Sequence, residues 1–214
     1  MSYSSIWLVD NEFNGRKDIE FDNSWWFSPI VMNVLFHKYM PDKSVDIFGN
    51  KSSFLTQIMF DESIGETLNI LLSESDIIED RILWELVNQQ MFNCEDKNFI
   101  SDCIIKFIET NKEYMYEYGE HIIDRFKEIS NYIKGIKLSS ENSYFIFKNT
   151  NCDDDVEILF KYYNEETDKL EKCSIVNKPT DDVEIWLVII EDNKIDGFVN
   201  NLILKDIYKF NKLE

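Results

Sequence analysis

The sequence predicts an α+β fold, in which central helices pack on a C-terminal, mainly antiparallel sheet that follows a mixed N-terminal segment. Residues 51–138 repeat apolar side chains at three- and four-residue steps, which is typical of amphipathic helices. Residues 140–205 instead contain short runs rich in Ile, Val, Phe and Tyr, separated by turn residues. The 214 residues, 44% of them hydrophobic, are enough for one domain spanning 1–214.

The N-terminal segment, residues 1–50, combines strand and helix signals. Ser5–Val9 is a short apolar run followed by two polar residues, and it predicts a strand. Ser28 precedes a proline, which predicts an N-cap and a helix over Pro29–Tyr39 that ends before Pro41. Val45–Phe48 predicts a second short strand.

The central region predicts helices throughout. Apolar spacing between Ile64 and Leu72 and between Ile78 and Val87 indicates two helices, the second capped by Ser75 or Asp76. One apolar stripe continues from Ile100 to Ile136 and predicts a single long helix. Gly119 interrupts this stripe, so a kink or a close helix contact is expected there.

The C-terminal region predicts adjacent antiparallel strands. They are expected at Tyr144–Lys148, Val156–Tyr163, Leu170–Val176, Glu184–Ile190 and Ile195–Leu204. Asn164–Asp168 and Asp192-Asn193 have the chemistry of turns between neighbouring strands. Ile185–Ile190 is apolar without alternation, which predicts an interior strand covered on both faces.

The net charge of −19, from 41 acidic and 22 basic residues, restricts the class of partner. Such a field repels nucleic acid and anionic lipid and attracts basic protein surfaces, so we expect a basic protein as partner, no nucleic acid and no membrane. The N-terminus has no basic, apolar signal segment, and no run is long enough to span a membrane, which predicts a cytoplasmic protein. The four cysteines form no CxxC pair and are expected to be free thiols.

No motif for catalysis, cofactor binding or metal binding is found, so none of these is predicted. The sequence lacks GxSxG, GxGxxG, HExxH and Walker A patterns, and its six glycines offer little for a phosphate-binding loop. His37 near a helix end favours the helix dipole, and His121 shares a helix face with Glu117, which predicts a structural pair.

Two acidic clusters are the candidate contacts for a basic partner. Each precedes a strand of the form Asp-Asp-Val-Glu-Ile, and together they comprise Asp153, Asp154, Asp155, Glu157, Asp181, Asp182 and Glu184. The alternative is an ordinary solvated surface. Trp25 and Trp26 are either a core staple ahead of the Ser28 cap or an exposed aromatic anchor for the partner.

Three segments together resemble the immunity proteins of bacterial polymorphic and contact-dependent toxin systems. They are Ser5–Asp10, the aromatic Ser24–Phe27 and the acidic Glu184–Leu204. The resemblance implies a small cytosolic inhibitor that binds one cognate toxin domain, often a basic nuclease, and blocks its active site. It transfers no individual site residue.

Three other functions are compatible with the sequence. An acidic surface with evenly spaced carboxylates could mimic nucleic acid and inhibit a DNA-binding defence enzyme. A hydrolase or transferase could assemble its site from residues far apart in sequence, in a pocket with perturbed carboxylates. An acidic scaffold domain would need no basic partner.

Overall fold

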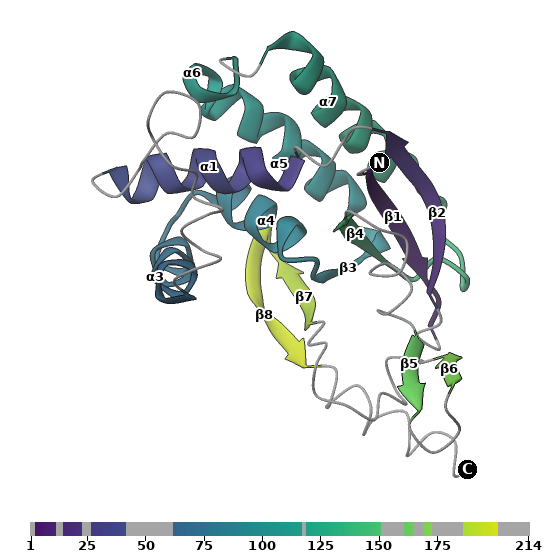
Figure 1. The fold of residues 1–214 in the computed structure, drawn as a ribbon. Helices are drawn as coiled ribbons and strands as arrows, with labels where there is room; N and C mark the ends of the chain where they lie inside the picture. Colours follow the sequence, from purple (N-terminus) through teal and green to yellow (C-terminus); the bar gives the residue numbers. More distant parts are fainter. Residues whose placement is uncertain are drawn as a thin grey trace.

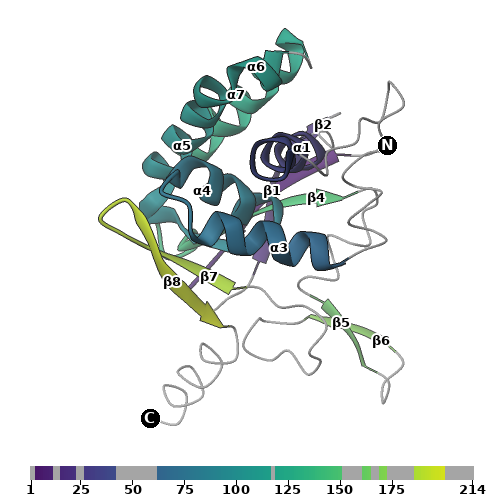
Figure 2. The same cartoon turned by 90° about the vertical axis from the view of Figure 1, so that its left-hand side faces the viewer.

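The structure, a computed structural model, describes residues 3–11, 15–22, 27–41, 62–116, 119–150, 161–164, 169–172 and 186–200. It confirms the α+β class. The helices are α1 (Phe27–Tyr39), α3 (Glu62–Ser73), α4 (Ile78–Val87), α5 (Lys97–Thr110), α6 (Lys112–Met115) and α7 (Glu120–Gly135). Figures 1 and 2 show them gathered on one side of a six-stranded sheet.

The sheet is mixed rather than antiparallel throughout. Its strands, in spatial order, are β2 (Gly15–Asp22), β1 (Tyr3–Val9), β4 (Tyr144–Thr150), β3 (Met91–Asn93), β7 (Trp186–Glu191) and β8 (Lys194–Asn200). Only β3 and β7 pair in parallel; the other pairs of this sheet are antiparallel. A separate two-stranded antiparallel sheet joins β5 (Lys161–Asn164) to β6 (Lys169–Lys172).

Both faces of the sheet carry buried apolar rows that cross four strands in register. The row on the helix side belongs to the main core cluster and consists of Leu8, Phe145, Phe92 and Val188. The row on the opposite side consists of Trp7, Ile146, Met91 and Leu187. Consecutive buried residues in β7 confirm the predicted interior strand, because neighbours along a strand point to opposite faces.

The β7–β8 hairpin confirms the turn predicted at Asp192-Asn193. Glu191 pairs with Lys194, so the loop contains two residues, and both have positive φ, at 49° and 59°. This is a type I′ turn, whose twist matches that of the flanking strands and which Asp and Asn adopt more readily than most residues.

The sheet is not built from residues 140–205 alone, because β1, β2 and β3 join β4, β7 and β8 in it. β4 pairs with the N-terminal β1 and with β3, rather than with the next strand along the sequence. β3 lies within the region predicted to be entirely helical. Gln89, at φ 59°, turns the chain after α4, and the Gln90 side chain accepts a hydrogen bond from the Trp186 amide (2.7 Å), which extends the β3–β7 contact.

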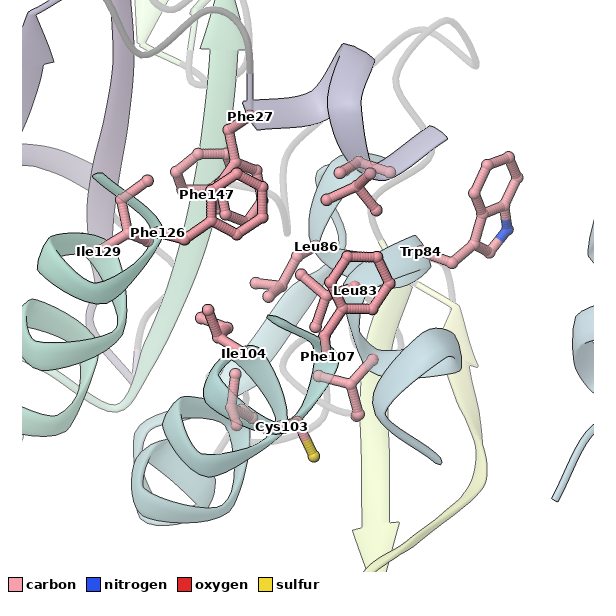
Figure 3. Packing of buried hydrophobic residues seen from close by; sticks show 14 of the residues in the cluster. Phe27, Leu83, Trp84, Leu86, Cys103, Ile104, Phe107, Phe126, Ile129 and Phe147 are labelled. Carbon is pink, nitrogen blue, oxygen red and sulfur yellow. The ribbon is translucent and has the colours of Figure 1, made fainter. Parts of the chain in front are cut away.

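The predicted Ser28 cap is also wrong. The helix starts at Phe27, and the buried Ser28 hydroxyl has no hydrogen-bond partner in the described part of the chain. The Phe27 ring explains the earlier start, because it stacks on Phe126 of α7 (centroids 4.3 Å apart) and packs against Phe147 of β4 (4.7 Å; Figure 3). Burying this ring favours the helical position over the capping geometry.

The single helix predicted between Ile100 and Ile136 is three helices. α5 ends at Thr110, and the side chain of Asn111, its C-cap, donates a hydrogen bond to the Phe107 carbonyl (3.0 Å). Gly119 precedes α7 with φ 95° and ψ 159°, a conformation essentially restricted to glycine. The apolar stripe continues across both breaks, because α5 and α7 fold back and pack against each other in the same core.

Several predictions lie outside the described residues. These are the strand at Val45–Phe48, most of the strands at Val156–Tyr163 and Leu170–Val176, and Cys152 and Cys173. The other two thiols, Cys94 and Cys103, are free and buried, as predicted.

We expect Gly119→Ala to destabilise the protein by about 1–3 kcal/mol, because a side chain is strained at this φ. Its Cβ would also come within 3.1 Å of the His121 ring. Gly65→Ala in α3 is the matched control, since a Cβ there meets nothing within 4 Å and favours the helix by about 0.5–1 kcal/mol. Urea denaturation measures the free energy of unfolding of both variants. Equal changes in the two would contradict the strained conformation assigned to Gly119.

Candidate functional site

All of the predicted partner contacts lie outside the described residues. They are Trp25, Trp26, Asp153, Asp154, Asp155, Glu157, Asp181, Asp182 and Glu184. The described part of the chain buries its acidic charge elsewhere, on the first turn of α4, at Glu79 and Asp80.

Asp80 is fully buried and joins α4 to α1 and α5. Its Oδ2 accepts hydrogen bonds from Lys38 Nζ (2.6 Å) and from the Tyr39 hydroxyl (2.8 Å), both at the end of α1. Its Oδ1 accepts a longer hydrogen bond (3.3 Å) from Nδ2 of Asn111, the residue directly after α5. A buried carboxylate with an ammonium partner and two further donors has its desolvation compensated.

Glu79 makes a second, parallel connection between α4 and α5. Lys106 Nζ donates to its Oε2 (3.0 Å) and Thr110 Oγ1 to its Oε1 (3.0 Å). Burial acts to raise the pKa of Glu79, but the bonds from Lys106 and Thr110 outweigh it and hold that pKa below the ordinary value. Glu79 is therefore an ionised, fully satisfied structural carboxylate.

Tyr39 also belongs to this network, and its hydroxyl group has a structural role. Its hydroxyl donates to Asp80 and lies 2.8 Å from Ser75 Oγ, which also accepts the Ile77 amide (3.1 Å). Burial, with Asp80 as acceptor, raises the pKa of Tyr39 well above its usual range, so the phenol keeps its proton. The arrangement fixes helices; it supplies neither a base nor a nucleophile.

Glu85 lies further along α4, and the surroundings of its carboxyl group differ from those of Glu79 and Asp80. It is half-buried, and its carboxyl group has no hydrogen-bond partner in the described part of the chain. Burial raises the pKa of Glu85 to about 7, although the charge of Arg81 acts in the opposite direction. A carboxyl group that titrates near neutrality can transfer protons, but the charge that acts on its pKa is that of Arg81 and not that of a second acid.

The thiols and histidines do not converge either. Burial raises the pKa of Cys94 and Cys103 to about 12, which leaves both as unreactive thiols. His37 stacks on Tyr114, and His121 is exposed; its predicted partner Glu117 lies outside the described residues. Within the described ranges, no group of three or more potential ligands could hold a metal ion.

The remaining described carboxylates are mostly at the surface. Some form exposed ion pairs, such as Glu20 with Lys17 and Asp102 with Lys134. Others are exposed and form no ion pair with described residues, including Glu66, Glu74, Asp76, Glu95, Glu109, Glu113, Glu120, Glu141 and Asp196. The helices in the described ranges are all too short or too polar to cross a membrane.

Sequence reasoning missed the Glu79–Asp80 network, although a signal for it exists. Two acids in the first turn of a helix are ordinarily explained by the helix dipole. However, Asp80 stands three and seven residues before Leu83 and Val87, both buried. It therefore lies on the buried face of α4, where a charge requires a partner.

Comparisons of the chain with protein-family models, with curated proteins and with solved structures found no match. The functional argument therefore depends on the charge and geometry of this chain.

We expect Asp80→Asn to destabilise the protein by about 3 kcal/mol, because it leaves Lys38 without its buried counter-charge. The control is Asp76→Asn, at an exposed position of the same segment, which should change stability by less than about 0.5 kcal/mol. Combining Asp80→Asn with Lys38→Met should cost less than the sum of the single changes. Chemical denaturation measures the stability of Asp80→Asn, Asp76→Asn, Lys38→Met and the double variant. Additive losses would show that the pair is not coupled.

Glu85→Gln should stabilise the protein at about pH 8 by on the order of 2 kcal/mol, because each unit of pKa shift corresponds to about 1.4 kcal/mol. The folded state keeps a proton on Glu85 that the unfolded state releases above about pH 4.3, so wild-type stability falls as the pH rises toward 7. The variant and the wild type should converge near pH 4. Stability measured across this range checks the slope; a constant difference would contradict the raised pKa.

Proposed function

We propose that this chain is an acidic cytoplasmic binding protein that neutralises a basic protein partner, most specifically an immunity protein that blocks a nuclease-type toxin domain. The observation that carries the proposal is the net charge of −19. A toxin domain that cleaves nucleic acid needs a basic active-site cleft, and a strongly acidic protein is complementary to such a cleft.

The distribution of charge supports this proposal. Glu79 and Asp80 are the acidic residues buried in the described core, and each is paired with a lysine, Lys106 and Lys38 respectively. Most of the other described carboxylates are exposed to solvent, so most of the excess charge on the described residues is available to a partner. A field of this kind accelerates association by about 10- to 1,000-fold at low ionic strength and favours basic partners over acidic ones.

The clusters Asp153–Asp155 with Glu157 and Asp181, Asp182 with Glu184 remain the predicted contacts for the toxin. They are compact in sequence, and each combines several charges within a few residues. Charged contacts of this kind determine the rate and selectivity of association, whereas aromatic side chains supply most of the affinity.

The test is co-expression with the product of the adjacent gene, scored by growth and by that product's activity. We expect the chain to suppress toxicity, and the purified pair to associate at least about tenfold more slowly when salt is raised from low to physiological concentration. Absence of binding together with undiminished toxicity would overturn the proposal.

The matched comparison replaces the clustered acids by Asn or Gln in one variant. A second variant neutralises an equal number of exposed acids in and between the helices, such as Glu66, Glu74, Asp76 and Glu95. Both variants have the same net charge, so a larger loss of association rate in the first would locate the contact. Equal losses would assign the effect to net charge alone and reject the clusters as contacts.

A further inference from the structure

An exposed aromatic surface lies at the end of α1 and on α6, outside the polar network of α4. We define it as the aromatic ledge of His37, Tyr114 and Tyr116. The two tyrosines are 38% and 50% exposed, and they are among the most exposed large side chains of the described residues. Exposed tyrosines are typical of interface anchors.

The ledge is rigid for a surface feature. The His37 and Tyr114 rings are nearly parallel, with planes 7° and centroids 6.1 Å apart, and this contact joins α1 to α6. Met115, between the two tyrosines, is fully buried in the core. Tyr114 and Tyr116 are therefore positioned before any partner arrives, which lowers the entropic cost of binding.

The ledge already accommodates a cation. The Lys112 ammonium lies over the Tyr116 ring, 5.4 Å from its centroid. The attraction depends on the electron-rich face of the ring, and arginine forms such contacts more often than lysine because its planar guanidinium also stacks.

Negative charge surrounds the ledge. Glu113 is adjacent to Tyr114, Glu120 follows Tyr116 by four residues, and Glu109 lies one turn before α6. All three are exposed and form no ion pair with a described residue. The positive charges nearest to the ledge in sequence are Lys112 and Lys38, and Lys38 is already paired with Asp80. An aromatic surface bordered by free carboxylates is complementary to arginine side chains on a protein surface.

We propose that the aromatic ledge is an anchor for the basic partner, and that arginine side chains of that partner stack on Tyr114 and Tyr116 while Glu113 and Glu120 pair with their charge. This inference rests on the proposed function, since it identifies where on the described surface the basic partner docks. It adds a preference for arginine over lysine, which net charge alone does not create.

The test uses labelled oligoarginine and oligolysine peptides of equal length as probes, at physiological salt, with fluorescence anisotropy as the measurement. We expect wild-type protein to bind oligoarginine more tightly. The Tyr114→Ala, Tyr116→Ala double variant should lose about fivefold or more in affinity for oligoarginine and change little toward oligolysine. The corresponding double Phe variant, which keeps both rings, should retain the preference.

Matched controls are Ile70→Ala and Leu138→Ala, which remove apolar side chains that are more exposed than the tyrosines (59% and 56%) from α3 and from the segment after α7. Neither should change the affinity for oligoarginine. Circular dichroism and thermal melting should show that the tyrosine variants keep the fold.

The failures of the two proposals are distinguishable. If wild-type protein binds both peptides equally and the alanine variant matches it, the ledge is overturned and the charge-based function stands. If wild-type protein binds neither peptide, the ledge is overturned, and the proposed function is decided by the co-expression test. An equal loss in the Ile70 or Leu138 control would also reject the ledge, because the effect would then come from exposed apolar area in general.

Discussion

The buried carboxylate of Asp80 is the interaction on which the arrangement of the helices depends. It accepts hydrogen bonds from the end of α1 and from the residue after α5, so one side chain positions three helices. The donor Asn111 also ends α5 and precedes α6, and α6 carries Tyr114 and Tyr116. An apolar residue at position 80 could fill the same volume, but it would not select the partners Lys38, Tyr39 and Asn111. The polar network thus determines how the helices meet, while the surrounding apolar side chains supply most of the stabilisation.

Local sequence signals predicted much of the fold. The apolar run at Ser5–Val9, the helix through Tyr39 and the Asp192-Asn193 turn each depend on neighbouring residues, and the structure contains all three. The predictions that were wrong concerned residues whose structure depends on contacts with segments distant in sequence. Phe27 is helical because it meets Phe126 and Phe147, and β3 is a strand because β4 and β7 lie on either side of it. Periodicity cannot report such pairings, since Met91–Asn93 is too short to have a period of its own.

The site was harder to predict than the fold. The sequence identified acidic clusters by their density, and those residues lie outside the described ranges. The aromatic ledge escaped notice because Tyr114 and Tyr116 belong to the same apolar-rich region as residues that form the core, such as Met115. Only the break of the long helix at Asn111 and Gly119 turns this segment outward. In the proposed function, surface charge and rigid aromatic groups would have complementary roles, since charge extends over long distances and ring contacts form at short range.

The parallel pairing of β3 with β7 has a consequence for how the protein is made. Met91 pairs with Leu187, and Trp7 of β1 pairs with Ile146 of β4, so the sheet joins segments that leave the ribosome far apart in time. The helices can form early in the nascent chain, but the strands they cover stay incomplete until translation is nearly finished. A topology with such long-range contacts folds slowly and exposes unpaired strand edges meanwhile. The large negative charge keeps these unfinished chains apart, so the acidity of the protein serves its synthesis as well as its surface.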